Sequence, residues 1–230
     1  MFPRTALVTG GTSGIGAAIV EALRAEGAAV ESLDLQDGFD VSDPGAWETV
    51  GPVELACLNA GVVTGAADVA RLSVEDYRRM VGTNLDGVVF GTRRLAQVLE
   101  PGAAIVVTAS LAGLTAMPTD PIYSLTKHGL VGFVRSVAPQ LAERGIRTNA
   151  VAPGIADTPL LGESRERYER AGFPLLSADE VARAVLLAAR SEGWGEVWFV
   201  QPGREPAPFR FPSVPGPRDP SGNPVGVPPS

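Results

Sequence analysis

The chain has 230 residues, of which 45% are hydrophobic and 20% charged, as in a soluble globular protein with room for one large α/β domain. A net charge of −7 excludes a surface for nucleic acid or an anionic membrane, because its long-range field repels polyanions. The one cysteine, Cys57, predicts a buried thiol in a reducing, cytoplasmic compartment, and the one histidine, His128, cannot build the usual metal cluster. We therefore expect no metal.

The sequence gives no sign of a membrane span or of a signal peptide. No apolar run approaches the length of a membrane span. The first four residues lead straight into the first predicted strand, so we expect no signal peptide.

Six strand-like runs alternate with helix-like stretches along the chain. This alternation predicts a doubly wound parallel sheet with helices on both faces, in one domain over residues 1–201. The runs are nearly continuous in Val, Leu, Ile and Ala, as in strands that are buried on both faces. The predicted strands are 5–8, 29–33, 53–58, 104–108, 147–151 and 196–200. The predicted helices are 14–26, 44–50, 74–99, 122–143 and 178–189.

The glycine-rich stretch Thr9-Gly10-Gly11-Thr12-Ser13-Gly14-Ile15-Gly16 joins the first strand to the first helix. Gly10 allows a sharp turn, Gly14 allows the backbone to approach a pyrophosphate, and Gly16 allows close packing of helix on sheet. The amides of Ser13, Gly14 and Ile15 would then face the anion from the positive end of the helix. By itself such a turn also occurs without any ligand.

Asp34 ends the second strand, 18 residues after Gly16. A carboxylate there can accept both ribose hydroxyls of an adenosine and repels a 2′-phosphate. Neither Thr12, Ser13 nor Leu35 offers a basic side chain, so the sequence favours NAD over NADP. The alternative is a solvated aspartate at a strand end.

The interval after Asp34 is unusually short. Five residues separate it from Asp40, whereas a parallel crossover needs about a dozen. We therefore expect a missing helix, a short or absent strand near Phe39, and a truncated sheet edge.

Ser110, Tyr123 and Lys127 form the most informative constellation. Tyr123 and Lys127 are spaced i, i+4, so they share one helix face, and Ser110 follows a predicted strand. An ammonium beside the phenol, together with a nicotinamide cation, lowers its pKa, and the phenol can then exchange a proton with a carbonyl or alcohol oxygen. A solvated helix face is the alternative for the Tyr/Lys pair alone.

Together with Asn59-Ala60-Gly61, Asn84 and Pro153-Gly154, these motifs resemble the short-chain dehydrogenase/reductase family over about residues 4–200. The resemblance implies a Rossmann sheet of order 3-2-1-4-5-6-7 and hydride transfer between NAD(P) and a secondary alcohol or ketone. Tyr123 would be the general acid/base, Ser110 would hold the substrate oxygen, Lys127 would bind the nicotinamide ribose, and Asn84 would hold a proton-relay water.

The resemblance also implies cofactor contacts and an assembly. Asn59, Ala60 and Gly61 would lie beside the cofactor, Asp40 and Val41 beside its adenine. Pro153, Gly154, Ile155 and Thr158 would cover its nicotinamide. A homo-oligomer, either a dimer or a tetramer, is expected. Departures from the family pattern include Leu58, which replaces a common Asn, and Gln201-Pro202-Gly203, which replaces Asp-Gly-Gly.

Several residues leave alternatives open. Leu111, Met117, Pro118, Leu160 and Leu161 could line an apolar substrate pocket or serve only packing, and residues 163–170 read as an exposed lid. His128 should point away from the face that carries Tyr123 and Lys127.

Residues 202–230 hold ten of the twenty prolines and cannot form a helix or a central strand. They form either a disordered tail or an arm on this or a neighbouring subunit.

The rival function is a non-catalytic NAD(H)-binding sensor or scaffold on the same fold, which has no need of Asn84, Ser110, Tyr123 and Lys127 together. A dehalogenating lyase on this fold would be expected to carry Arg at position 127.

Overall fold

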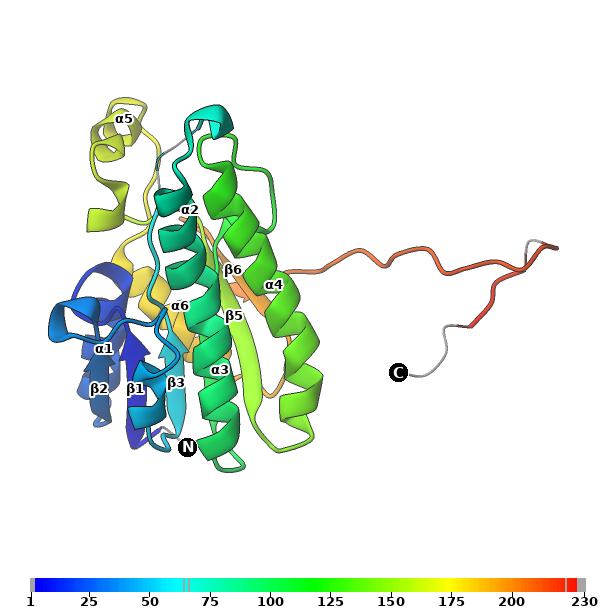
Figure 1. Ribbon diagram of the computed structural model, residues 1–230, viewed down its shortest axis with the longest axis horizontal. Helices are drawn as coiled ribbons and strands as arrows, with labels where there is room; N and C mark the ends of the chain where they lie inside the picture. Colours follow the sequence, from blue (N-terminus) through cyan, green and yellow to red (C-terminus); the bar gives the residue numbers. More distant parts are fainter. Residues whose placement is uncertain (1–2, 64, 66, 222, 227–230) are drawn as a thin grey trace.

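The computed structural model describes residues 3–63, 65, 67–221 and 223–226, and its centre is a seven-stranded sheet (Figure 1). The strand order is β2-β1-β3-β4-β5-β6-β7, and every pairing from β2 to β6 is parallel. The predicted doubly wound parallel sheet is therefore confirmed. The strands are β1 (Thr5–Thr9), β2 (Ala29–Leu33), β3 (Leu55–Leu58), β4 (Ala104–Thr108), β5 (Arg147–Pro153), β6 (Val197–Val200) and β7 (Ala207–Pro208).

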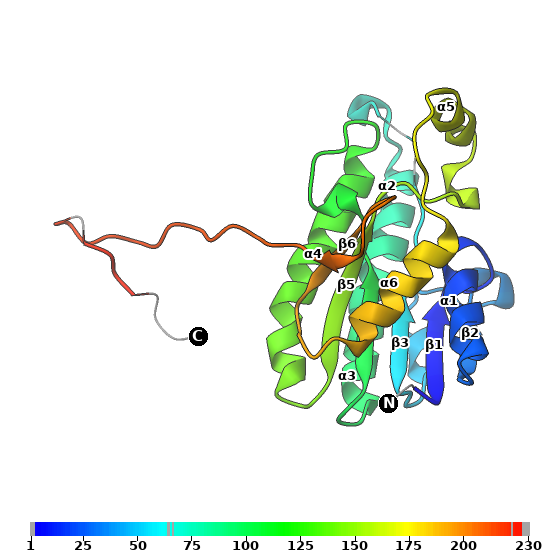
Figure 2. The ribbon, with the colours of Figure 1, turned by 180° about the vertical axis from the view of Figure 1, so that it is seen from behind.

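Helices cover both faces of the sheet, as Figures 1 and 2 show from opposite sides. On one face α1 packs beside α6, and on the other lie α2, α3 and α4. The two faces bury separate apolar clusters, and neighbouring residues of β1 divide between them: Val8 lies in one and Leu7 in the other. The helices are α1 (Gly14–Ala25), α2 (Val74–Val81), α3 (Gly87–Val98), α4 (Pro121–Ala142), α5 (Ser164–Arg170) and α6 (Ala178–Arg190).

The long helix predicted over residues 74–99 is interrupted. A π-helical turn, Gly82–Asp86, separates α2 from α3. A π turn inserts an extra residue, and such insertions are frequent at functional sites because they redirect a side chain. Here the turn buries Asn84 completely.

The segment between β2 and β3 confirms the missing crossover. Residues 34–54 contain no strand and no α-helix, only two short 3-10 turns, so β2 is the edge strand. The helix predicted over 44–50 is therefore wrong: Ala46–Thr49 form a single 3-10 turn. Trp47 closes this edge: its buried indole donates a hydrogen bond to the Val41 carbonyl (2.9 Å) and packs on α3 at Gly91. The outermost strand of the family's sheet order is thus absent.

The proline-rich segment begins as part of the sheet. β7 pairs antiparallel with β6, at the edge of the sheet where proline is tolerated. Phe211 packs against the core cluster of the α4 face, with the Arg135 guanidinium 3.8 Å from its ring centroid. The described residues from Pro212 onward extend away from the body (Figure 1). In the part of the chain that the structure describes, no helix is long and apolar enough to cross a membrane.

Candidate functional site

A cavity of about 770 Å³ opens where the parallel strands end. The carboxyl edge of such a sheet is the usual ligand site, because the strand-to-helix turns diverge there and leave a crevice. Most predicted site residues line this cavity: Gly10, Ser13, Gly14, Ile15, Asp34, Asp40, Val41, Asn59, Ala60, Gly61, Ser110, Tyr123, Lys127, Pro153, Gly154, Ile155 and Thr158. The other three do not line it: Gly16 and Asn84 are buried, and Thr12 is exposed.

The glycine turn has the geometry of an anion cradle. Gly10 and Gly14 have φ of +64° and +51°, a backbone conformation that favours glycine. A Cβ on Gly16 would collide with the Gly10 carbonyl oxygen, so only glycine lets α1 start this close to β1. The first amides of α1 have no partner within the helix and carry its positive dipole end toward the cavity. A pyrophosphate fits this donor set.

Asp34 lies at the same end of the cavity, and Thr12 holds it in place. The Thr12 hydroxyl and amide donate to Asp34 Oδ2 (2.7 and 3.2 Å), and the Gln36 amide donates to Oδ1 (3.2 Å). Partial burial opposes ionisation, but these hydrogen bonds outweigh it and keep the pKa of Asp34 below its ordinary value. Thr12 therefore orients the carboxylate and does not line the cavity itself.

Polar side chains fasten the central strand ends together. Thr9 Oγ1 accepts the Asn59 amide (2.9 Å), and Asn59 Oδ1 accepts the Thr108 hydroxyl (3.1 Å). These bonds join the ends of β1, β3 and β4 and leave the small residues Ala60 and Gly61 facing the cavity. The floor of the cavity is thus held in one arrangement.

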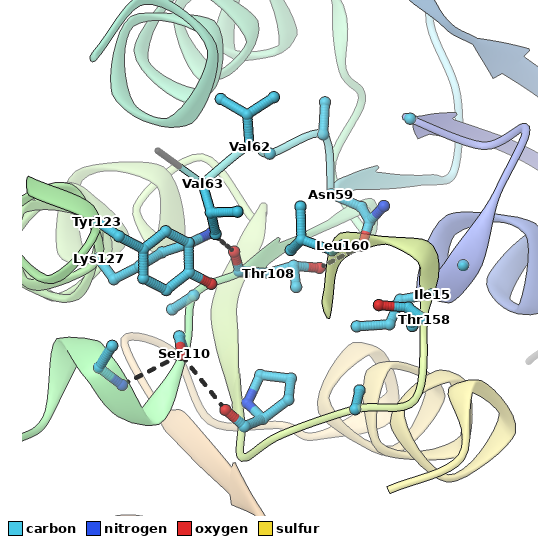
Figure 3. Close-up of a pocket in the computed structure, with 18 of the residues that line it drawn as sticks. Ile15, Asn59, Val62, Val63, Thr108, Ser110, Tyr123, Lys127, Thr158 and Leu160 are labelled. Atoms are coloured by element: carbon cyan, nitrogen blue, oxygen red, sulfur yellow. Dashed lines mark hydrogen bonds between the residues drawn. The ribbon is translucent and has the colours of Figure 1, made fainter. Parts of the chain in front are cut away.

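Tyr123, Lys127 and Ser110 converge on one wall (Figure 3). Tyr123 and Lys127 lie one turn apart on α4, with Lys127 Nζ 5.4 Å from the Tyr123 ring centroid. Lys127 Nζ donates to the Thr108 carbonyl (2.8 Å), at the end of β4. Ser110 Oγ accepts the Ala112 amide (3.1 Å), donates to the Pro153 carbonyl (3.5 Å) and lies near enough to the Tyr123 hydroxyl to influence its pKa. The two hydroxyls can therefore meet one substrate oxygen.

Burial dominates the electrostatics of this wall. Burial raises the pKa of Tyr123 to about 12. The negative charge of Asp120 also raises this pKa, whereas the Ser110 hydroxyl lowers it. Burial also lowers the pKa of Lys127, the single lysine of the sequence, to about 8. The expected lowering of the Tyr123 pKa is thus not seen in the protein alone, because desolvation of the phenolate outweighs other influences.

Asn84 has a structural role in this arrangement. Its Oδ1 accepts the Val62 amide (2.7 Å), and its Nδ2 donates to the Val62 carbonyl (2.9 Å) and to Thr126 Oγ1 (3.2 Å). The side chain therefore pins the loop after β3 against α4. The water-relay role of Asn84 stays a prediction.

Some residues of the cavity wall were not predicted from the sequence. Val62, Val63, Tyr168, Phe173 and Gln201 all line the cavity. Gln201 could have been found, because it directly follows β6 and so lies at the carboxyl edge of the sheet. The valines and the aromatic pair carry no sequence signal beyond their apolar character.

Four of the five apolar residues suggested for a substrate pocket line the cavity, and the lid role of residues 163–170 stays a prediction. Leu111, Met117, Leu160 and Leu161 line the cavity, whereas Pro118 does not. The expected exposed stretch 163–170 contains α5, with Tyr168 packed on Phe173 (ring centroids 5.6 Å apart).

His128 and Cys57 behave as predicted. His128 is exposed and lies outside the cavity, and Cys57 is buried, which raises the pKa of its thiol to about 12. The described residues contain no group of three or more His, Cys, Asp or Glu that could hold a metal ion.

The sequence is similar to those of known dehydrogenases and reductases. The family model described as Enoyl-(Acyl carrier protein) reductase matches residues 45–192. An uncharacterised short-chain type dehydrogenase/reductase of Sinorhizobium fredii is 34% identical over 82% of this chain, which spans 41% of that protein's length. A mitochondrial borneol dehydrogenase of Lavandula x intermedia is 31% identical, with 82% of this chain and 84% of that protein covered.

Solved structures share the fold and contain nicotinamide cofactors. A short-chain dehydrogenase from Burkholderia cenocepacia in complex with NADP has a TM-score of 0.77 at 27% identity, covering 86% of this chain and 96% of that one. A 3-ketoacyl-(acyl-carrier-protein) reductase from Brucella melitensis complexed with NADH has a TM-score of 0.76 at 25% identity, covering 87% and 98%. Both the sequence matches and these structures lead to one conclusion: this chain belongs to the short-chain dehydrogenase/reductase family.

Proposed function

We propose that this protein is an NAD-dependent oxidoreductase that interconverts a secondary alcohol and a ketone. One observation carries the proposal. Tyr123, Ser110 and Lys127 converge on one wall of a cavity whose other end holds the start of α1 and Asp34. A proton-transfer group and a dinucleotide cradle thus share one space.

The chain's own groups have distinct tasks in this reaction. NAD, when bound, supplies the hydride acceptor. Ser110 holds the substrate oxygen by a hydrogen bond, and Tyr123, protonated at neutral pH, donates its proton when a ketone is reduced. In the reverse direction its phenolate takes the proton of the alcohol.

Lys127 stabilises that phenolate. Its Nζ is held by the Thr108 carbonyl at the Tyr123 ring, so that in its charged form it places an ammonium beside the phenol. It also presents a donor to a ribose. Asn84 supports this wall from behind, and we retain its water-relay role as part of the proposal.

The preference for NAD rests on Asp34. Its carboxylate is held ionised and faces the adenosine end of the cavity. Among the described residues that line the cavity, Lys127 is the one basic side chain, and it lies on α4 beside Tyr123. A 2′-phosphate would therefore meet negative charge without a cation to compensate.

The remaining features complete the proposal. Residues 1–201 would form the catalytic domain, with residues 202–230 as an arm in a dimer or tetramer. A single buried thiol suits a reducing compartment, so we place the protein in the cytoplasm.

The test combines cofactor binding with turnover. NADH and NADPH are titrated by fluorescence, and secondary alcohols and ketones are then assayed with wild type, Tyr123→Phe and Asp34→Ala. Tyr77→Phe is the matched control, because Tyr77 lies on α2 outside the cavity.

We expect tighter binding of NADH than of NADPH, and a smaller difference in Asp34→Ala. Turnover should be lost in Tyr123→Phe, with NADH binding retained, and kept in Tyr77→Phe. Activity in Tyr123→Phe would remove Tyr123 from its role. NADH binding without turnover on a broad panel would favour the sensor or scaffold.

A further inference from the structure

Gln201 is a polar side chain in an otherwise apolar part of the cavity wall. It is half-buried, and its amide has no hydrogen-bond partner among the residues that the structure describes. A side-chain amide offers both donors and an acceptor, and at a half-buried place these groups are open to a bound molecule. A bound molecule that reaches this wall can supply that partner.

The fold builds a place for this side chain. Gly154 directly follows β5, and Gln201 Oε1 lies against it, 2.7 Å from the place that a Cβ would take. The Arg204 amide donates to the Gln201 carbonyl (3.1 Å), and β7 then pairs back onto β6. This hairpin fixes the backbone of Gln201.

Gln201 lies near the reacting groups but not on them. It follows β6, two strands away from the end of β4 that carries Ser110. Neighbouring strands are about 4.8 Å apart, so the two backbones are separated by roughly 10 Å. The Gln201 side chain spans part of this gap, since its Oε1 lies at Gly154 beside Leu111, so a group bound by Gln201 would be a neighbour of the reacting carbon in the ligand and not that carbon itself.

The surroundings define the rest of the ligand. Leu111 lies beside Gln201 at Gly154, and the lid side adds Leu160, Tyr168 and Phe173. The charged side chains among the described lining residues are Asp34 and Asp40 at the adenosine end and Lys127 beside Tyr123. Apart from Lys127, which the Thr108 carbonyl holds, the described lining residues of the substrate end carry no positive charge to pair with a carboxylate or phosphate.

We propose that Gln201 is a specificity-determining residue that binds a second, uncharged oxygen of the substrate, separate from the reacting carbonyl oxygen. This inference rests on the proposed function. It makes the substrate class a largely apolar alcohol or ketone with one further hydroxyl or carbonyl group. The carboxamide of the cofactor offers the same hydrogen-bonding groups to Gln201. The experiment therefore distinguishes binding of Gln201 to the substrate from binding to the cofactor.

The experiment compares ketones that differ by one hydroxyl group: cyclohexanone with 4-hydroxycyclohexanone, and 2-decalone with 6-hydroxy-2-decalone. kcat/KM is measured for each with wild type, with Gln201→Met, which keeps the length and removes the amide, and with Gln140→Met. Gln140 is an exposed residue of α4 outside the cavity and serves as the matched control. NADH affinity and the shift in Tm caused by each ketone with NADH present are measured in parallel.

We expect wild type and Gln140→Met to prefer the hydroxylated member of at least one pair by about tenfold, the worth of one neutral hydrogen bond. In Gln201→Met that preference should disappear, with unchanged NADH affinity. Equal preference ratios in wild type and Gln201→Met would overturn the inference. So would a weaker affinity for NADH with unchanged ratios, which would assign Gln201 to the cofactor.

The thermal shifts keep this inference apart from the proposed function. A Gln201-dependent stabilisation by the hydroxylated ketone without any turnover would support the binding role and reject the oxidoreductase. Turnover without any preference in wild type would support the oxidoreductase and reject the role of Gln201.

Discussion

Lys127 gives the sharpest physical prediction, because it is buried and is the single lysine in the sequence. Burial penalises the ammonium and lowers the pKa of Lys127 from 10.5 to about 8. The folded pKa thus lies below the unfolded one, so between about pH 8 and 10.5 the unfolded chain binds more protons. Its free energy of unfolding therefore rises with pH in that window, since the cost of burying the charge is progressively removed.

The size of the effect follows from this difference in pKa. One pKa unit corresponds to about 1.4 kcal/mol, so integration from pH 7 to 9.5 gives a gain of about 2 kcal/mol for wild type relative to Lys127→Met. Taking the difference between the two proteins cancels the contributions of Cys57 and the chain termini.

The assay is urea unfolding of both proteins at intervals between pH 7 and 9.5. Selective labelling with 13C-lysine gives one side-chain resonance, whose titration reads the pKa of Lys127 directly. A resonance that titrates above pH 10, with parallel pH profiles for the two proteins, would refute the claim that Lys127 is desolvated.

Three further predictions concern the parts that hold the wall in place. A chain that ends at Gln201 loses β7, so its free energy of unfolding in urea titrations should be at least about 2 kcal/mol lower than that of wild type. The free energy of unfolding of a chain that ends at Pro212 should stay within about 0.5 kcal/mol of wild type. Equal stabilities would show that β7 contributes nothing. Asp120→Asn removes a buried negative charge that raises the pKa of Tyr123. The tyrosinate transition in an ultraviolet pH titration should therefore move to lower pH. An unchanged transition would contradict this effect of Asp120. Trp47→Ala should cost about 3–5 kcal/mol in thermal or urea unfolding, and a cost under 1 kcal/mol would mean that Trp47 does not close the truncated edge.

Much of this molecule follows from local sequence rules. A strand that runs into the glycine turn at Gly10 and Gly14 can continue only as a tight turn into a helix, because both residues need positive φ. Strand and helix alternation dictates a parallel sheet, which in turn brings Asp34, Ser110 and Gly154 to one edge. The five residues after Asp34 were too few for a crossover, and β2 is the sheet edge for that reason.

Other features depend on contacts between distant segments, which no local pattern specifies. Asn84 needs the π turn to reach Val62, and the helical periodicity of residues 74–99 gives no sign of that insertion. Thr12 binds Asp34 across 22 residues, so its hydroxyl serves the carboxylate and does not face the cavity. Only the folded chain places such groups within hydrogen-bonding distance.

The chemistry of the wall shows the same division. The i, i+4 spacing of Tyr123 and Lys127 determined that they share a helix face, because that is a property of one helix. Their pKa values depend on how completely β4 and the rest of the sheet exclude water from that face, and desolvation depends on the whole packed structure. Spacing along the chain decided that Tyr123 and Lys127 meet, and tertiary burial decided the direction in which their pKa values move.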